Sequence, residues 1–330
     1  MRILFWGTPE FAVPSLRALD AEGFDLVGVV TQPDRPAGRG RRLRPSAVRE
    51  EATELGLPVL TPEHPRTEEF TGAIRALRPD VSVVVAYGHI LRPEVLAIPR
   101  LGSINVHASL LPALRGAAPI NWAIARGHTE TGVTIMRMVE AMDAGPVLLR
   151  VREPILPGES AGELSLRLSE VGAAALVETL LLLDAGVAEE VEQDHAAATF
   201  APKVDRSSAR IDWSLPAPEV AALVRGMDPV PGAWAELGAD PVKLFRPSAW
   251  SAAEVASLEA DGTPTNGGPR RRGDSPRPGL VLAANADVGV LVATGVGGVA
   301  FAEVQPPGGR RMSAADWVNG RGVEAGQRFA

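Results

Sequence analysis

The sequence of 330 residues contains no cysteine. The chain therefore has no disulfide, no thiolate nucleophile and no cysteine ligand for zinc or iron–sulfur clusters, and we expect no metal site. Long apolar runs are also missing. The first apolar run ends at Gly7, too early for a signal peptide, and no stretch of roughly 18 apolar residues follows it. We therefore expect a cytoplasmic protein that does not insert into a membrane.

Positive charge is in deficit, with 33 basic against 40 acidic residues and a formal net charge of -7. This balance argues against a general nucleic-acid-binding protein. The deficit lies in residues 1–202, since residues 203–330 carry 14 basic and 14 acidic residues. One segment of the acidic part reverses the sign, with the arginines Arg35, Arg39, Arg41, Arg42 and Arg44. By itself this cluster fits either a solvated loop or a contact with an anionic partner.

The N-terminal part alternates predicted strands and helices. Residues 2–6 and 26–31 predict two strands, and Thr8, Pro9 and Gly23 predict the cap, the first turn and the end of the helix between them. Further strands are predicted at residues 81–85, 103–106, 133–138 and 147–151. Apolar strands that alternate with helices form a mainly parallel sheet covered on both faces. We expect an α/β, Rossmann-like domain.

The pattern changes in the second half of the chain. A capping box at Ser160–Glu163 begins a long helix that Gly186 ends, and a second one at Ser313–Asp316 begins a short helix. Between them a helix is expected at residues 216–226. Short strands with Gly and Pro turns are expected at residues 232–237, 242–247, 279–284, 288–294 and 299–305. Such strands predict a small β-barrel.

These changes predict two domains. The first spans residues 1–185, residues 186–203 form a linker without clear periodicity, and the smaller second domain spans residues 204–330. Inside the second domain, residues 251–278 include the low-complexity run DGTPTNGGPRRRGDSPRPG. We expect a disordered loop insertion there.

Three polar residues are candidates for chemistry. Asn105 and His107 are two apart on a predicted strand, so their side chains project to the same side. Ligands of open α/β sheets bind beyond the carboxyl ends of the strands, where these two side chains are expected. Asp143 follows the strand at 133–138 and can approach the same crevice.

An amide, an imidazole and a carboxylate suit acyl transfer. Asn105 can donate to an oxygen that becomes negative, His107 can polarise that oxygen or relay protons, and Asp143 can orient the imidazole. The spacing alone leaves a structural alternative open. A histidine at a strand end is more often structural, Asn105 can cap a turn, and Asp143 can initiate one.

The sequence resembles the methionyl-tRNA formyltransferases from Ile3 to about residue 250 and again from Gly279 onward. The shared motifs are Gly7-Thr8-Pro9, Asn105-x-His107, Ser109-Leu110-Leu111-Pro112, Arg115-Gly116-Ala117-Ala118-Pro119-Ile120, Gly132-Val133-Thr134-Ile135-Met136 and Asp143-x-Gly145. This set is shared by the wider 10-formyltetrahydrofolate-dependent transferases. The segments TQPDRPAGRG and RIDWS are typical of the tRNA enzymes.

The resemblance implies roles for these positions. Asn105, His107 and Asp143 take the catalytic positions, and the loops that follow the strands at 81–85 and 133–138 take the walls of the pterin pocket. The implied cofactor-binding residues are Ser109, Leu110, Leu111, Pro112, Ala86, Tyr87, Gly88, Ile90 and Val139.

The resemblance also implies a use for the basic cluster. Residues 34–45 correspond to a loop that engages the acceptor end of initiator tRNA, and the implied tRNA-binding residues are Arg39, Arg41, Arg42 and Lys203. The second domain is similar to an OB-fold.

The implied reaction is transfer of the formyl group from 10-formyltetrahydrofolate to the methionine amine of initiator methionyl-tRNA by a monomeric enzyme. A folate-dependent formyltransferase acting on a small amine is the nearest alternative, but it leaves the basic cluster and the second domain unexplained. A dinucleotide-dependent dehydrogenase is disfavoured because the turn that begins at Gly7 lacks the glycines that cradle a pyrophosphate. A tRNA-binding module without activity is the third alternative.

Overall fold

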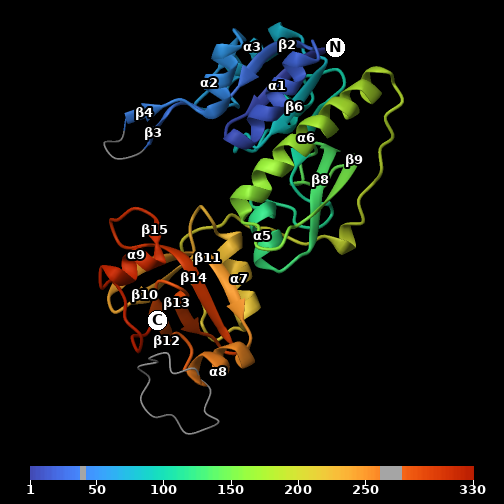
Figure 1. Cartoon of the computed structure of the whole chain (residues 1–330). Helices are drawn as coiled ribbons and strands as arrows, with labels where there is room; N and C mark the ends of the chain where they lie inside the picture. The colour runs from blue at the N-terminus through green and yellow to red at the C-terminus, as the bar shows by residue number, and fades with distance from the viewer. Residues whose placement is uncertain (38–41, 261–276) are drawn as a thin grey trace. The chain divides into compact units, whose positions relative to one another are not determined.

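A computed structural model describes residues 1–37, 42–260 and 277–330 (Figure 1). They form two compact units. The first comprises Met1–Pro119, Glu130–Pro154 and Ser165–Pro202, and the second comprises Ile120–Thr129, Ile155–Leu164 and Lys203–Ala330. The units are thus not contiguous in sequence, unlike the predicted domains, and most of the predicted linker at 186–203 packs within the first unit.

The first unit is built on a seven-stranded sheet with the order β5-β2-β1-β6-β7-β8-β9. The strands are β1 (Arg2–Gly7), β2 (Asp25–Val30), β5 (Val59–Leu60), β6 (Val81–Val85), β7 (Ser103–His107), β8 (Glu130–Arg137) and β9 (Val147–Pro154). The first five strands in this order pair in parallel, whereas β7–β8 and β8–β9 pair antiparallel. The predicted mainly parallel sheet is confirmed.

Helices and a small hairpin complete the first unit. They are η1 (Glu10–Ala12), α1 (Val13–Ala21), α2 (Ala47–Glu54), α3 (Glu68–Leu77), α4 (Pro93–Leu96), α6 (Ala161–Asp184), η2 (His195–Ala197) and the hairpin β3 (Arg35–Ala37) with β4 (Arg42–Arg44). The first residues of α6 belong to the second unit. In Figure 1 the hairpin extends away from the sheet of its own unit.

The first helix begins later than its sequence predicts. Thr8 does not cap it, because the Thr8 hydroxyl donates a 2.9 Å hydrogen bond to the carbonyl oxygen of Tyr87 in the loop after β6. A 3₁₀ turn comes first, and α1 then starts with Ala12 at its N-cap and a proline in its first turn. Thr8 therefore ties together the loops that follow β1 and β6, at the carboxyl edge of the parallel strands.

The second unit is an antiparallel sheet with the order β10-β11-β14-β13-β12, and β15 pairs with β14. The strands are β10 (Trp234–Leu237), β11 (Asp240–Trp250), β12 (Val281–Asn285), β13 (Gly289–Ala293), β14 (Gly298–Gln305) and β15 (Met312–Ser313). Isolated β-bridges pair Phe329 with Leu237 of β10 and Arg328 with Leu280, which directly precedes β12. The C-terminal segment thus joins the two edges of the sheet. The predicted small barrel is confirmed.

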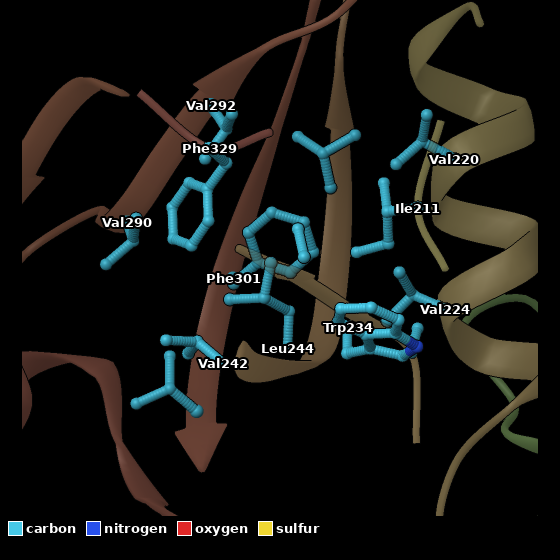
Figure 2. Close-up of a cluster of buried hydrophobic side chains, with 14 of the residues drawn as sticks. Ile211, Val220, Val224, Trp234, Val242, Leu244, Val290, Val292, Phe301 and Phe329 are labelled. Carbon is cyan, nitrogen blue, oxygen red and sulfur yellow. The ribbon is translucent and has the colours of Figure 1, made fainter. Parts of the chain in front are cut away.

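The core of the second unit lies between this sheet and its helices α7 (Ala217–Gly226) and α9 (Ala314–Asn319). Figure 2 shows Val220 and Val224 of α7 directed toward the aromatic side chains of the sheet. The ring of Trp213 meets that of Phe301 edge-on at 6.0 Å. Helix α5 (Pro119–Ala125) joins this unit through Asn121, whose amide donates to the Gly226 carbonyl oxygen at 2.7 Å.

The predicted loop at 251–278 is partly wrong. Helix α8 occupies Ala252–Ala260. Ser251 and Glu254 form a capping box at its start, and Val255 packs in a buried cluster with Leu282 and Leu291. Leu258 of the same helix packs against this cluster as well. The low-complexity composition predicts a loop because it does not reveal the cap and the tertiary packing that stabilise the helix. Residues 261–276 lie outside the described part of the chain.

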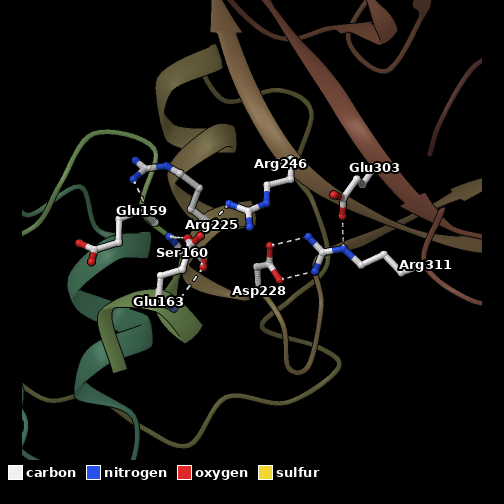
Figure 3. A network of polar contacts seen from close by, with 8 residues as sticks. All are labelled: Glu159, Ser160, Glu163, Arg225, Asp228, Arg246, Glu303 and Arg311. Atoms are coloured by element: carbon white, nitrogen blue, oxygen red, sulfur yellow. Dashed lines mark hydrogen bonds and ion pairs between the residues drawn. The ribbon is translucent and has the colours of Figure 1, made fainter. Parts of the chain in front are cut away.

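The capping box of α6 is observed as predicted (Figure 3). The Glu163 carboxylate accepts bonds of 2.7 Å and 2.9 Å from the hydroxyl and backbone N–H of Ser160. Arg246 adds a 2.9 Å bond to the same carboxylate. The Ser160 hydroxyl bond, the Ser160 backbone bond and Arg246 together lower the pKa of Glu163 from 4.5 to about 2.

This pKa predicts a pH dependence of stability. Because the folded pKa of Glu163 lies below its ordinary value, the ionised form stabilises the fold at full strength above pH 4.5, and the contribution is lost as the pH falls toward 2. We expect the free energy of unfolding of the wild type to fall more over this interval than that of Glu163→Gln. Chemical unfolding of both proteins across the interval measures the difference, and parallel losses would contradict the prediction.

Candidate active site

Strand β7 carries two of the predicted catalytic residues. Asn105 pairs in register with Val84 on β6 and Met136 on β8, and His107 lies opposite Thr134. Side chains two apart on a strand point to one face, so the amide and the imidazole share a side of the sheet. Asn105 is half-buried, and within the described part of the chain its side chain makes no hydrogen bond. Its amide is therefore open to a ligand.

Asp143 lies beside His107. It occupies the loop between β8 and β9, and its carboxylate Oδ2 is 3.7 Å from His107 Nδ1. The same oxygen accepts a 2.7 Å hydrogen bond from the backbone N–H of Gly116. Only 6% of the His107 side chain and 15% of the Asp143 side chain are exposed. The structure thus brings imidazole and carboxylate together where little water screens their charges.

The imidazole is oriented from its other side as well. His107 Nε2 lies 3.0 Å from the carbonyl oxygen of Leu114. A carbonyl oxygen only accepts, so Nε2 carries a proton and Nδ1 is the ring nitrogen on the Asp143 side. Leu114 is itself held, because its backbone N–H donates to the Thr199 hydroxyl oxygen at 2.9 Å. The ring is therefore fixed between the loops that follow β7 and β8.

The predicted folate signature at Ser109 to Pro112 is held mainly by internal bonds. The Ser109 hydroxyl donates to the Ala113 carbonyl oxygen at 2.6 Å. Thr134 of β8 donates its hydroxyl to the Ser109 carbonyl oxygen and accepts from the Leu111 backbone N–H. Ser109 and Leu111 are buried, whereas Leu110 and Pro112 are half-exposed. Any ligand contact of this segment therefore falls to Leu110, Pro112 or the backbone.

Of the predicted cofactor residues in the loop after β6, Tyr87 is buried, whereas Ala86, Gly88 and Ile90 are exposed. Tyr87 is 2% exposed, and its ring meets the Trp6 ring edge-on at 5.3 Å. Burial raises the pKa of Tyr87 to about 12. Ala86 and Gly88 are both exposed and have positive φ, and Ile90 is 80% exposed. Tyr87 can thus reach a ligand only through its backbone.

Left-handed backbone occurs repeatedly around these residues. Ala86, Leu114 and Asp143 are non-glycine residues with φ of 48°, 60° and 52°. Each such conformation costs on the order of 1 kcal/mol and persists only where surrounding contacts impose it. Positive φ at three positions of one region is typical of a binding or catalytic site.

A pocket of about 330 Å³ lies where β7 begins and β8 ends. Its lining residues are Pro93, Leu96, Ala97, Leu101, Gly102, Ser103, Arg137, Met138, Val139, Glu140 and Glu190. Val139 is the predicted cofactor residue in this wall, and Asn105, His107 and Asp143 are not part of it. We therefore do not assign the reaction centre to this pocket.

Comparisons with known proteins decide the family. The formyl transferase family matches residues 1–180, and the formyl transferase C-terminal domain matches residues 203–322. The methionyl-tRNA formyltransferase of Symbiobacterium thermophilum is 46% identical over 330 residues, which cover 100% of this chain and 95% of that protein. The chain belongs to the methionyl-tRNA formyltransferase family. The Bacillus licheniformis member of this family is 43% identical, with 99% and 98% of the two chains covered.

Solved structures share the fold at low sequence identity. The methionyl-tRNA formyltransferase of Clostridium thermocellum superposes with a TM-score of 0.55 and 15% identity, and covers 75% of this chain and 93% of its own. HypX from Aquifex aeolicus in complex with tetrahydrofolic acid gives 0.61 and 20%, with 96% and 47% covered. An N-formyltransferase from Helicobacter canadensis, in complex with folinic acid and dTDP-3-aminofucose, gives 0.64 and 14%, with 91% and 98% covered.

The structure describes only part of the residues that the family resemblance links to tRNA. Arg39 and Arg41 fall outside the described residues, as does the side chain of Arg42, whose backbone pairs with Ala37 in the β3–β4 hairpin. Lys203 is exposed at the start of the long C-terminal segment of the second unit.

Two features of the described residues concern metal binding and membrane crossing. In that part of the chain, no cluster of three or more His, Asp or Glu side chains is arranged to hold a metal ion. No helix there has the length and apolarity required to cross a membrane.

Sequence reasoning missed one layer of the site. The segment at 186–203, predicted as a linker, contributes Gln193, His195 and Thr199 to contacts with the loops that follow β7 and β8. The segment has no periodicity that predicts burial, yet Gln193 is 5% exposed. The sequence around Gln193 contains no local pattern that predicts a buried residue there.

Proposed function

We propose that this formyltransferase moves the formyl group of 10-formyltetrahydrofolate to the α-amine of methionine on initiator methionyl-tRNA. The observation that carries the proposal is the His107–Asp143 pair, 3.7 Å apart and mostly buried, on the side of the sheet where the Asn105 amide is open. The family supports the reaction class, and folate-bound structures with the same fold support a folate donor.

The three side chains have complementary roles. The folate cosubstrate supplies the formyl carbon that the amine attacks. Asn105 donates its amide N–H to the formyl oxygen as that oxygen becomes negative, a contribution typically worth about 10²–10³ in rate. His107 donates from Nδ1 to the same oxygen, and the Asp143 carboxylate stabilises the charged ring. Asp143 also assists the transfer of the amine proton toward the folate nitrogen that leaves.

The tRNA partner is assigned to the basic loop and the linker. Arg39, Arg41, Arg42 and Lys203 contact phosphates at the acceptor end, where guanidinium and ammonium groups give affinity that depends on salt. The catalytic residues all come from one unit of one chain, which favours a monomer. We place the enzyme in the cytoplasm, because its tRNA substrate is used there in translation.

A substrate comparison tests the proposal. Labelled 10-formyltetrahydrofolate is offered with charged initiator tRNA, charged elongator tRNA and glycinamide ribonucleotide in parallel reactions. We expect formylation of the initiator tRNA at a kcat/KM at least roughly 10²-fold above the other two acceptors, a discrimination of a few kcal/mol. Equal or faster formylation of glycinamide ribonucleotide would refute the tRNA assignment while retaining the transferase.

The same assay with the Arg39→Ala variant tests whether the basic loop binds tRNA. We expect KM for initiator tRNA to rise several-fold with kcat kept, and the salt dependence of KM to weaken, because a phosphate contact is lost. Arg66→Ala removes an exposed arginine of the same unit outside the basic loop and serves as the control. Identical kinetics for both variants would remove the loop from the proposal.

A further inference from the structure

A buried amide lies behind Asp143. Gln193, on the segment that follows α6, is 5% exposed. Its Nε2 donates a 2.9 Å hydrogen bond to the carbonyl oxygen of Asp143 and a 2.7 Å bond to that of Gly145. Both donors of the amide are therefore used on the backbone of the loop that carries the carboxylate.

Arg115 determines which way this amide points. Arg115 is 7% exposed, and its Nε and Nη2 donate to Gln193 Oε1 at 3.2 Å and 2.6 Å. Guanidinium groups only donate, so the amide oxygen must face Arg115 and the amide nitrogen must face the two carbonyl oxygens. Nη2 also lies 2.9 Å from His195 Nδ1, which accepts from it. The orientation of Gln193 is thus unambiguous.

The segment that follows α6 also holds the loop whose Gly116 N–H binds the Asp143 carboxylate. The backbone N–H of Arg115 donates to the Thr199 carbonyl oxygen at 2.9 Å, and the Ala201 N–H donates to the Arg115 carbonyl oxygen at 2.7 Å. The next residue, Gly116, donates its N–H to Asp143 Oδ2. The segment at 186–202 therefore fixes Asp143 from two directions, through its backbone and through its carboxylate.

Asp143 needs such support, because its φ of 52° is disfavoured for a residue with a side chain. Neighbouring Gly145 is tightly confined, since a Cβ there would meet the Arg137 carbonyl oxygen at 2.0 Å. The two Gln193 bonds flank this stretch. Without them, the two carbonyl oxygens lose their partner and the loop can relax toward an ordinary backbone conformation.

We propose that Gln193, oriented by Arg115, is a positioning residue for formyl transfer that keeps the Asp143 carboxylate against His107. The proposal rests on the catalytic role assigned to Asp143. It gives the segment at 186–202 a function in catalysis in addition to its connecting role.

Two variants separate the contact of Gln193 with Arg115 from its bonds to the Asp143 and Gly145 carbonyl oxygens. Gln193→Ala removes the contact with Arg115 and both carbonyl bonds. Gln193→Glu keeps an acceptor for Arg115 but presents no donor to the Asp143 and Gly145 carbonyl oxygens. We expect both variants to lose kcat by about 10²-fold, the size expected for a misplacement near 1 Å, with KM for both substrates nearly unchanged. Asp194→Ala, which removes the exposed cap of η2 next in the chain, is the control and keeps wild-type kcat.

A double-mutant cycle with Asp143→Asn distinguishes positioning from general stabilisation. Single-turnover transfer of labelled formyl is measured for the wild type, Gln193→Ala, Asp143→Asn and the double variant, with melting temperatures for all four. If Gln193 acts through Asp143, Gln193→Ala costs little further rate once Asp143 is replaced. Equal fold losses in both backgrounds, or a loss confined to KM, would overturn the proposal. Wild-type transfer by Asp143→Asn would instead refute the assigned role of Asp143 itself.

Discussion

Replacing Asp143 with asparagine is expected to lower kcat by roughly 10³- to 10⁴-fold, as occurs when the carboxylate partner of a catalytic histidine is neutralised. In the wild type the Gly116 N–H donates to Asp143 Oδ2 at 2.7 Å. The asparagine side chain keeps an oxygen that can accept this bond, so the loop is preserved. What is lost is the negative charge 3.7 Å from His107 Nδ1. The doubly protonated His107 ring that donates from Nδ1 to the formyl oxygen then has no counter-ion.

Steady-state formylation of initiator methionyl-tRNA measures this effect, with tRNA affinity and melting temperature as checks on folding. Glu130→Gln, which neutralises an exposed acid at the start of β8, is the matched control and keeps full turnover. A turnover of Asp143→Asn within tenfold of the wild type would show that the carboxylate does not take part in the reaction.

The second large effect concerns stability. In the second unit, Asp228 and Arg311 form a bidentate ion pair with distances of 2.7 Å and 3.0 Å (Figure 3). The Asp228 side chain is 6% exposed, and the guanidinium also pairs with Glu303 and lies 4.0 Å from the centroid of the Phe245 ring. Asp228→Ala leaves a partly buried Arg311 without its main partner.

We expect Asp228→Ala to lower the free energy of unfolding by about 3 kcal/mol, the low end for breaking a buried ion pair, because Arg311 keeps Glu303. Tryptophan fluorescence during denaturation measures it, since Trp122, Trp213, Trp234, Trp250 and Trp317 are all in the second unit. Arg246→Gln breaks an exposed pair with Glu163 in the same network and should cost less than about 1 kcal/mol. Equal losses for the two variants would contradict the prediction.

Local sequence patterns predicted most of the elements that position the site. The apolar run at 81–85 is β6, and the capping boxes at Ser160 and Ser313 begin α6 and α9. The spacing of Asn105 and His107 correctly predicted one face of one strand. No pattern in the sequence predicted that β8 and β9 pair antiparallel. The direction of a strand depends on the path of the connection and not on the composition of the strand.

The sequence by itself determined the alternation of strands and helices, the caps, and the types of side chain available for chemistry, because periodicity and capping act within a few residues along the chain. The tertiary structure alone decided that Asp143 meets His107 and that Gln193, 50 residues beyond Asp143, supports it from behind. Contacts of that sequence separation depend on how whole elements pack, which no local pattern encodes. The unpatterned segment at 186–202 therefore looked like a linker in the sequence, and most of it is exposed in the folded chain, yet its buried Gln193 holds the loop that carries Asp143.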